Sequence, residues 1–454
     1  MDAPPRQPPN GAHHSASHRH RQSRRLLLSL TSWRQRLTFW CGAGVVGIAA
    51  VAFALAADQA QSLFHWGIDQ WRYLPLVVTP TGLALSAWLA VRIFPGSQGS
   101  GIPQAIAARH LDDDGRRHAL LSLRIMGGKI MLTLLGLACG ASIGREGPTV
   151  QVGASIMLAA GAIAGLGRER GLILAGGAAG VAAAFNTPLA GVVFAIEELA
   201  RGFDQRANGL VLSAIVIAGM ASMLLLGNYT YFGHTTIAVR WADWPVIPIV
   251  GVAGGLAGGL FTRTVLGLGG WLSRRLAGRH WVWPVGVAAV AGAVTAVLGV
   301  VEGGEIYGTG YAQARMVLEH SGTLSWGYMP AKLLATAAAT VAGIPGGLFA
   351  PSLSVGAGMG ALLSALIPGM PLATLVTLSM VAYFAGVVQA PVTATVIVME
   401  MTDGHASILP LMATAVIAFG LSRLVNSEPI YHAMAGRILN ALPAASQAPA
   451  PGPT

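Results

Sequence analysis

The sequence predicts an all-α membrane protein that crosses the bilayer many times, with broken helices and two related halves. Only 10% of its 454 residues are charged and 54% are hydrophobic, whereas a soluble domain carries roughly 25% charged residues. The 60 glycines are too many for simple leucine-rich spans and indicate close contacts between backbones. This composition excludes a soluble enzyme, a disordered chain and a secreted disulfide-rich scaffold.

Uncharged runs of residues mark the predicted membrane spans. A helix needs about 20 apolar residues to cross the hydrocarbon core. The runs are 37–57, 73–91, 130–144, 147–167, 171–196, 207–239, 244–262, 281–301, 333–399 and 404–422. Two of them, 207–239 and 333–399, must hold more than one helix, whereas 130–144 is too short to cross alone. Short segments interrupted by glycine and proline are typical of discontinuous helices that line a transport site.

The two ends of the chain are expected to lie outside a membrane transport domain of residues 37–437. Residues 1–36 are rich in Arg, His, Pro and Ser and predict a disordered, basic cytoplasmic tail. Residues 438–454 predict a short flexible tail. The net charge of +10 is then explained by basic residues on the cytoplasmic side of the membrane. We therefore expect a multi-pass protein of the cell (inner) membrane with both termini in the cytoplasm and no nucleic-acid partner.

The N-terminal tail also allows two other interpretations. Arg24 and Arg25, followed by an apolar run, match a twin-arginine export signal, although a first membrane helix with a basic flank fits better. Four histidines in the tail, at positions 13, 14, 18 and 20, offer metal ligands, although a solvated tail explains them as well. Cys41 and Cys139 have no CxxC neighbour, so we expect no disulfide and no metal site.

A repeat appears at a fixed offset of 203 residues (347 − 144). The pattern Gly144-x-x-x-Pro148-x-x-x-Val152-Gly153-Ala154 recurs as Gly347-x-x-x-Pro351-x-x-x-Val355-Gly356-Ala357. The same offset relates Pro188 to Pro391 and Glu197 to Glu400. These matches predict two related halves, near 37–225 and 244–437, that meet at a central site. They leave open whether the halves are inverted, as is common in transporters.

Three glycine-rich stretches share one design. Each combines glycines, which allow tight turns, with a proline that suits the first turn of a helix, and each precedes an apolar run. Three helix N-termini would then direct free backbone N–H groups and positive dipole ends toward one point. Such an arrangement binds an anion without a full cationic side chain. The stretches are Gly99-Ser100-Gly101-Ile102-Pro103, Gly144-Arg145-Glu146-Gly147-Pro148 and Gly347-Leu348-Phe349-Ala350-Pro351.

Glu146 is the most informative charged residue. A carboxylate at membrane depth costs roughly 2.5–3.5 kcal/mol on insertion scales, so such residues are usually functional. When charged, its carboxylate can occupy the anion site itself, and when protonated it should leave. We therefore expect it to exchange protons. The alternative is a structural ion pair between Glu146 and Arg145.

Other polar residues near the ends of the spans are less specific. Glu197 and Glu198 end the run 171–196, where a solvated helix terminus competes with a role in proton access, which Glu198 suits better. Glu400, the repeat counterpart of Glu197, is expected to serve packing. Tyr431, taken alone, suits an interfacial aromatic belt. No HExxH, GxSxG or P-loop motif occurs, so a membrane-embedded enzyme or scaffold lacks a catalytic pair.

Taken together, these motifs resemble the CLC family of chloride channels and chloride/proton antiporters. The resemblance covers residues 37–437 and extends through Phe185-Asn186-Thr187-Pro188-Leu189-Ala190-Gly191, Ile196-Glu197-Glu198 and Pro429-Ile430-Tyr431. It implies two inverted repeats of tilted and broken helices. It also implies a homodimer in the lipid bilayer in which each subunit has its own anion pathway. Chloride and protons are the transported ions, and no cofactor is implied.

The resemblance assigns the residues of an anion site. Ser100 and Tyr431 match side chains whose hydroxyls bind the central chloride, and Leu348 and Phe349 match positions that donate backbone N–H groups to it. All three glycine-rich stretches together then form the selectivity filter. Ser100 resembles the chloride-selective pattern, whereas proline at that position is associated with nitrate, and the fluoride branch differs around these motifs.

The resemblance also assigns proton carriers. Glu146 matches the external gating glutamate and Glu198 the internal proton glutamate, while Lys129 and Arg145 match supporting basic positions. An electrogenic chloride/proton antiporter is therefore the leading expectation, and a passive voltage- or pH-gated chloride channel is the alternative. No paired regulatory domains follow residue 437, so the chain resembles the short prokaryotic branch.

Overall fold

In the computed structural model, every regular element of the described part of the chain is a helix. The described residues are 30–165, 170–200, 208–227, 230–233, 239, 243–276, 282–320 and 322–442. The twin arginines and the four histidines of the predicted N-terminal tail lie outside these ranges, as does most of the predicted C-terminal tail.

The first half of the chain forms helices of very unequal length. They are α2 (Leu30–Gln70), α3 (Pro75–Arg92), α4 (Ile102–His110), α5 (Asp114–His118), α6 (Leu123–Ala138), α7 (Glu146–Ile163), α8 (Arg170–Phe185), α9 (Pro188–Phe194), the π-helical turn η1 (Ala195–Ala200) and α10 (Asn208–Leu226).

The second half repeats this order. Its helices are α11 (Val246–Leu276), α12 (Val282–Val301), α13 (Tyr311–His320), α14 (Tyr328–Val341), α15 (Phe349–Leu366), α16 (Leu372–Val388), α17 (Pro391–Met401), the short 3₁₀ turn η3 (His405–Ser407), α18 (Ile408–Val425) and α19 (Ile430–Ala441). In the described residues, eight helices are long and apolar enough to cross a membrane. The predicted class, an all-α polytopic membrane protein, is confirmed.

The helices differ in three places from the runs of uncharged residues. Helix α2 already begins at Leu30 and α19 continues to Ala441, so the helical domain extends beyond 37–437 at both ends. The run 207–239 contains only one helix, α10, among its described residues. The run 130–144 is not a separate short piece, because α6 begins at Leu123 and carries Lys129 in its interior. The predicted span ended at Lys129 because this residue is charged. Its ammonium group donates hydrogen bonds to Gln98 O and Gly99 O, which allows it to lie inside a helix.

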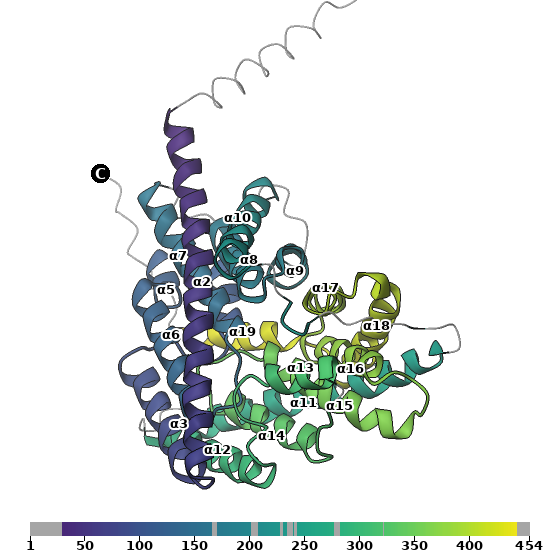
Figure 1. Ribbon diagram of the computed structural model, residues 1–454. Coiled ribbons are helices and arrows are strands. Elements are labelled where there is room, and N and C mark those ends of the chain that lie inside the picture. The colour runs from purple at the N-terminus through teal and green to yellow at the C-terminus, as the bar shows by residue number, and fades with distance from the viewer. Residues whose placement is uncertain are drawn as a thin grey trace, which may run out of the picture.

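The two halves pack by the same rules. Helix α7 packs against α8 as α15 packs against α16, and α2 contacts α10 as α11 contacts α18. The first pair touches at Gly153 and Gly176, where a Cβ on either residue would collide with the backbone oxygen of the other. Small residues of this kind let membrane helices approach closely. In Figure 1 the purple-to-blue half and the green-to-yellow half lie beside each other, with α19 near the middle.

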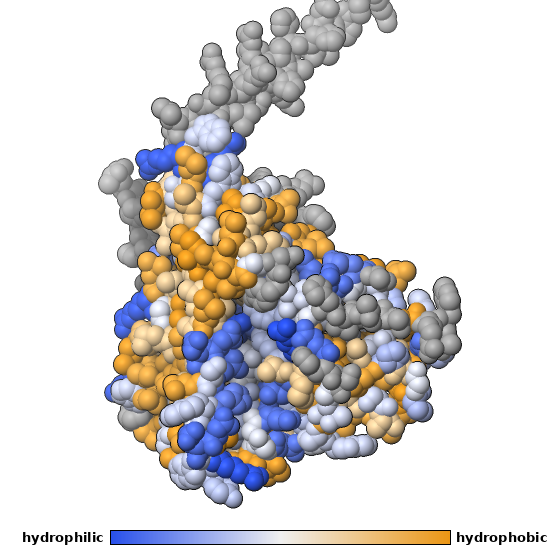
Figure 2. Space-filling model, in the orientation of Figure 1, coloured by the Kyte–Doolittle hydropathy of each residue, from blue (hydrophilic) through white to orange (hydrophobic). Residues whose placement is uncertain are grey.

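The surface is apolar over the outer helices and polar in the middle of one face. Figure 2 shows hydrophobic residues on the flanks of this view and hydrophilic residues gathered between them, beside the lower part of α2 in Figure 1. Leu224, Ile163 and Leu424 are among the most exposed large apolar side chains. An apolar outer surface is what a bilayer requires of a helical bundle.

Candidate anion-binding site

The three glycine-rich stretches meet inside the molecule. Gly144 and Gly347 exchange two backbone hydrogen bonds, with N···O distances of 2.8 and 2.6 Å, in an antiparallel bridge. Gly99 N donates to Gly343 O at 3.0 Å. A Cβ on Gly147 would collide with the hydroxyl of Ser100 and would lie 3.1 Å from the Cα of Gly347. The close approach of the backbones therefore requires glycine at positions 147 and 347.

A helix begins within each stretch. Helix α4 begins at Ile102, α7 at Glu146 and α15 at Phe349, and the first residues of all three are buried. The first four N–H groups of a helix have no partner inside that helix. Because the three stretches lie in contact, the positive ends of these helices meet in the interior, as the sequence predicts. Such a place favours a negative charge.

Two hydroxyl groups lie in the same interior without partners. Ser100 Oγ and Tyr431 Oη are buried and lie close enough to interact with each other, but neither makes a hydrogen bond of good geometry within the described part of the protein. The ring of Tyr431 packs on that of Phe349, with 5.9 Å between centroids, and Phe349 also packs on Phe384 at 4.9 Å. A buried polar group normally has a partner. Two donors without one, beside helix N-termini, fit an anion that the protein would bind there.

Glu146 is fully buried at the start of α7. Its Oε1 accepts a hydrogen bond from Tyr311 Oη at 2.7 Å, and its side chain folds against Gly144. The expected alternative, an ion pair with Arg145, is wrong, because Arg145 binds Asp58 at 2.6 Å. The carboxylate therefore lies among helix N-termini with a tyrosine hydroxyl as its side-chain partner.

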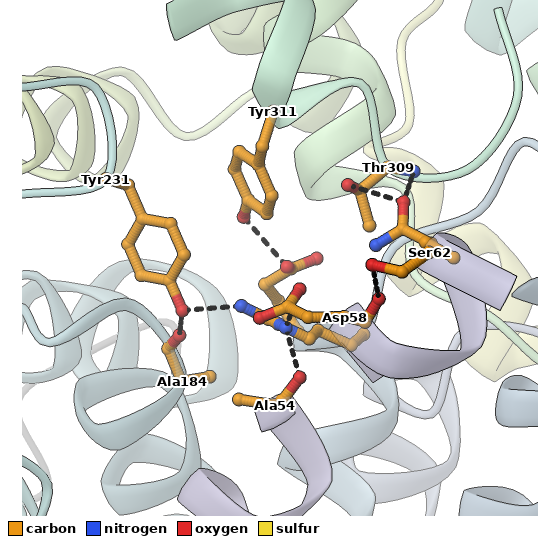
Figure 3. A network of polar contacts seen from close by, with 10 residues as sticks. Ala54, Asp58, Ser62, Ala184, Tyr231, Thr309 and Tyr311 are labelled. Carbon is orange, nitrogen blue, oxygen red and sulfur yellow. Dashed lines mark hydrogen bonds and ion pairs between the residues drawn. The ribbon is translucent and has the colours of Figure 1, made fainter. Parts of the chain in front are cut away.

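Two tyrosines from separate segments complete the surroundings of Glu146. Figure 3 shows Tyr231 and Tyr311 beside each other, with their hydroxyls directed into the cluster around Asp58. Their ring centroids are 5.0 Å apart. Tyr231 Oη accepts from Arg145 at 2.8 Å and donates to Ala184 O at 2.9 Å. A cavity of about 440 Å³, here called the α2/α13 cavity, opens next to this cluster.

The only two lysines of the chain, Lys129 and Lys332, are both fully buried. Lys129 Nζ donates to Gly99 O at 2.7 Å, and Lys332 Nζ donates to Gly308 O at 2.7 Å. They are 203 residues apart, so the repeat relates them to each other. The offset that revealed the glycine motifs therefore contained a signal for Lys332, which the motif search missed.

Glu198 lies in the π-helical turn η1 and is only 2% exposed. His432 Nδ1, one residue beyond Tyr431, lies 3.3 Å from Glu198 Oε1. His432 also lines a second cavity of about 770 Å³, here called the α11/α19 cavity, together with Arg263, Arg274 and Arg437. Glu197 instead binds backbone N–H groups at the N-terminus of α17. The two adjacent glutamates thus have different surroundings, which the sequence alone could not distinguish.

No cluster of three or more metal-ligating side chains occurs among the described residues, and Cys41 and Cys139 are free thiols. Two buried carboxylates, Glu146 and Glu198, both lie near the buried hydroxyl of Tyr431. Helix N-termini and buried hydroxyl donors suit an anion at this place.

The family described as voltage gated chloride channel matches residues 82–423. This chain belongs to that family. A cyanobacterial Cl⁻/H⁺ antiporter has a similar structure, with a TM-score of 0.78 and 25% sequence identity over 90% of this chain and 98% of that one. Membership makes this a membrane anion transport protein and not an enzyme.

Two further solved structures share the fold. A CLC-type fluoride/proton antiporter has a TM-score of 0.76 with 21% identity over 89% of this chain and 99% of that chain. A eukaryotic CLC transporter has a TM-score of 0.69 with 21% identity over 90% of this chain and 74% of that chain. These similarities confirm the expected architecture of inverted repeats, and at this identity they concern the fold alone.

Proposed function

We propose that this chain is an electrogenic chloride/proton antiporter of the cell membrane, with Glu146 as the gate. The observation that carries the proposal is the position of Glu146. Its carboxylate is fully buried at the N-terminus of α7, beside the start of α15. A carboxylate at that point competes with an anion for the same N–H groups.

In this mechanism the protonation state of Glu146 decides whether chloride passes. The ionised carboxylate is itself an anion at the helix N-termini and keeps the site filled. Protonation removes its charge and its preference for the dipole ends, so the side chain leaves and chloride takes its place. Because chloride and the ionised glutamate exclude each other, chloride moving one way is coupled to a proton moving the other way.

The chloride site proposed here combines backbone and hydroxyl donors. The hydroxyls of Ser100 and Tyr431 are buried without partners among the described residues, and the N–H groups of Leu348 and Phe349 lie at the start of α15. Lys129 does not bind the anion directly, because its ammonium group binds Gln98 O and Gly99 O. It holds the loop of Ser100 in place and adds a positive charge.

Glu198 is the proposed internal proton carrier. It is buried close to the α11/α19 cavity, where His432 lies between its carboxylate and the open space. In this proposal protons reach Glu198 through His432, and the anion takes a different route on that side. The resemblance further supports a homodimer with both termini in the cytoplasm. The homodimer can be tested by counting fluorescently labelled subunits in single proteoliposomes.

Reconstitution of the full chain in liposomes tests the function. With an imposed chloride gradient, an antiporter drives protons against their own gradient, and a passive chloride channel moves chloride alone. Chloride flux without uphill proton movement would therefore favour the channel. Absence of anion flux in a protein that folds would reject the proposal altogether.

Two single substitutions separate the proposed proton carriers. Glu198→Gln should leave chloride flux intact and abolish proton movement, whereas Glu146→Gln should give uncoupled flux because a neutral amide neither carries a proton nor competes as an anion. A matched control is Glu428→Gln, which also removes one carboxylate near the α11/α19 cavity and should retain coupling. If coupling persists in Glu146→Gln, this residue is not the gate.

A further inference from the structure

The loop before α13 repeats the loop of the proposed chloride site. Gly308-Thr309-Gly310-Tyr311-Ala312-Gln313-Ala314 matches Gly99-Ser100-Gly101-Ile102-Pro103-Gln104-Ala105 at an offset of 209 (308 − 99). The backbone agrees as well. Gly99 and Gly308 have φ angles of 68° and 67°, and Gly101 and Gly310 have φ angles of 105° and 80°. Each loop also gives a carbonyl to one of the two buried lysines.

The two loops differ at one position that matters. Ile102 is fully buried and packs in the apolar core at the start of α4. Its counterpart, Tyr311, starts α13 and directs its hydroxyl to Glu146 Oε1 at 2.7 Å. The second loop therefore places a hydrogen-bond donor on the proposed gate, where the first loop has an aliphatic side chain.

The position of the Tyr311 ring is fixed from several directions. It packs against Tyr231, and its centroid lies 5.6 Å from that of Phe232. Tyr231 is held in turn by Arg145 and by Ala184 O. Arg145 also donates to Ala54 O at 2.6 Å. Figure 3 shows this chain of contacts, which joins α2, the start of α7 and the start of α13.

Tyr311 also stands between Glu146 and open space. It lines the α2/α13 cavity, whereas Glu146 is not part of that lining and is fully buried. The other ionisable groups of the lining are Asp58 and His65 of α2, Arg145 before α7, Arg315 of α13 itself, and the phenols Tyr231 and Tyr307. Among all the described residues that line this cavity, Tyr311 alone makes a hydrogen bond to Glu146.

We propose that Tyr311 is a positioning residue that holds the ionised Glu146 in the anion site and thereby sets how readily the gate opens. This inference rests on the proposed role of Glu146. A phenol that donates to a carboxylate stabilises its charged form, and hydrogen bonds to charged groups are stronger than neutral ones. Acid releases the gate because protonation of Glu146 replaces the charged acceptor by a neutral one.

The test is Tyr311→Phe in the full chain, reconstituted in liposomes with equal pH on both sides. The variant keeps the ring and loses only the donor. Chloride turnover should be about tenfold higher than in the wild-type protein, and half-maximal chloride flux should be reached at a proton concentration about tenfold lower than in the wild-type protein. Tyr307→Phe is the matched control, since it lines the same cavity but donates to Ala296 O at 3.0 Å. It should leave the pH profile unchanged.

A double-mutant cycle with Glu146→Gln isolates the interaction. In that background, Tyr311→Phe should have no further effect on turnover or pH profile. An equal effect in both backgrounds, or none in the wild-type background, would overturn the inference while the gate role of Glu146 stands. If Glu146→Gln alone changes neither coupling nor pH profile, the gate role itself fails and the inference with it.

A second variant covers the case in which Tyr311→Phe does not fold. Tyr231→Phe keeps Tyr311 but removes the hydroxyl that Arg145 and Ala184 O hold, so the Tyr311 ring should lose part of its support. A smaller shift of the pH profile in the same direction supports the inference. An unshifted profile in a folded Tyr231→Phe protein contradicts it.

Discussion

Glu197 and Glu400 each bind the start of a helix that belongs to the other half of the chain. Glu197 accepts from Val392 N at 3.1 Å and Thr393 N at 2.6 Å, at the N-terminus of α17. Glu400 accepts from Leu189 N at 3.3 Å and Ala190 N at 2.6 Å, at the N-terminus of α9. The offset of 203 that links these glutamates in sequence is thus a reciprocal contact in the structure. It joins the halves through carboxylates placed at the positive ends of helices.

Removal of one of these charges should loosen the contact between the halves. Glu400→Gln keeps the side-chain length but replaces the carboxylate by an amide. One helix N–H then keeps only a neutral acceptor, and the other faces an NH2 donor and loses its hydrogen bond. We expect the free energy of unfolding to fall by about 1 kcal/mol, read as a lower thermal midpoint in detergent. Asp112→Asn is the control, because the pair of Asp112 with Arg170 is exposed on both sides and should contribute little. An equal loss in both variants would contradict the helix-cap explanation.

The two buried lysines should differ in function despite their equivalent geometry. Lys129 holds the loop of Ser100, so Lys129→Met leaves Gln98 O and Gly99 O without their donor and removes a positive charge beside the anion site. Chloride affinity, measured by calorimetry, should fall at least about tenfold. Lys332→Met is the matched control, since it frees Ile306 O and Gly308 O instead. It should spare chloride binding, and an equal loss of affinity would show that the lysines only support the fold.

Much of the site could be predicted because its signals are local. Glycine and proline determine turns and helix starts within a few residues. Pro148 and Pro351 both lie in the first turn of the helices that their motifs predict. Hydropathy is also a local property of the sequence, and it located most of the spans. It failed at Lys129, because a charge inside a helix is tolerated only when distant backbone carbonyls bind it, and sequence periodicity does not contain that information.

The partners of Glu146 could not be predicted, because they are contacts between distant segments. Tyr311 is 165 residues from Glu146 in the sequence, and a lone tyrosine after Gly310 carries no signal for a carboxylate. The repeat contained a partial signal, since the loop of Tyr311 matches the loop of Ser100. That match requires an offset of 209, six more than the offset of the other motifs (209 − 203). A search at one fixed offset therefore misses it.

The two hydroxyls without partners should contribute comparable amounts to anion binding. Ser100→Ala and Tyr431→Phe each remove one neutral donor, which should weaken chloride binding by roughly 3- to 10-fold. Tyr383→Phe is the control, because the hydroxyl of Tyr383 is also buried without a partner among the described residues but lies where α16 packs on α11. Its affinity for chloride should stay at the wild-type value. A loss of affinity in the control alone would place the anion elsewhere.

His432 should serve proton transfer between the α11/α19 cavity and Glu198. Its Nδ1 lies 3.3 Å from Glu198 Oε1, and its side chain is 20% exposed while that of Glu198 is 2% exposed. An imidazole can accept a proton at one ring nitrogen and donate one from the other, so His432→Gln should lower proton flux several-fold while chloride flux continues. Added imidazole should partly restore proton flux, which a merely structural role would not allow. His110→Gln, on the exposed end of α4, is the control and should keep the ratio of protons to chloride. An unchanged ratio in His432→Gln would mean that protons reach Glu198 by another route.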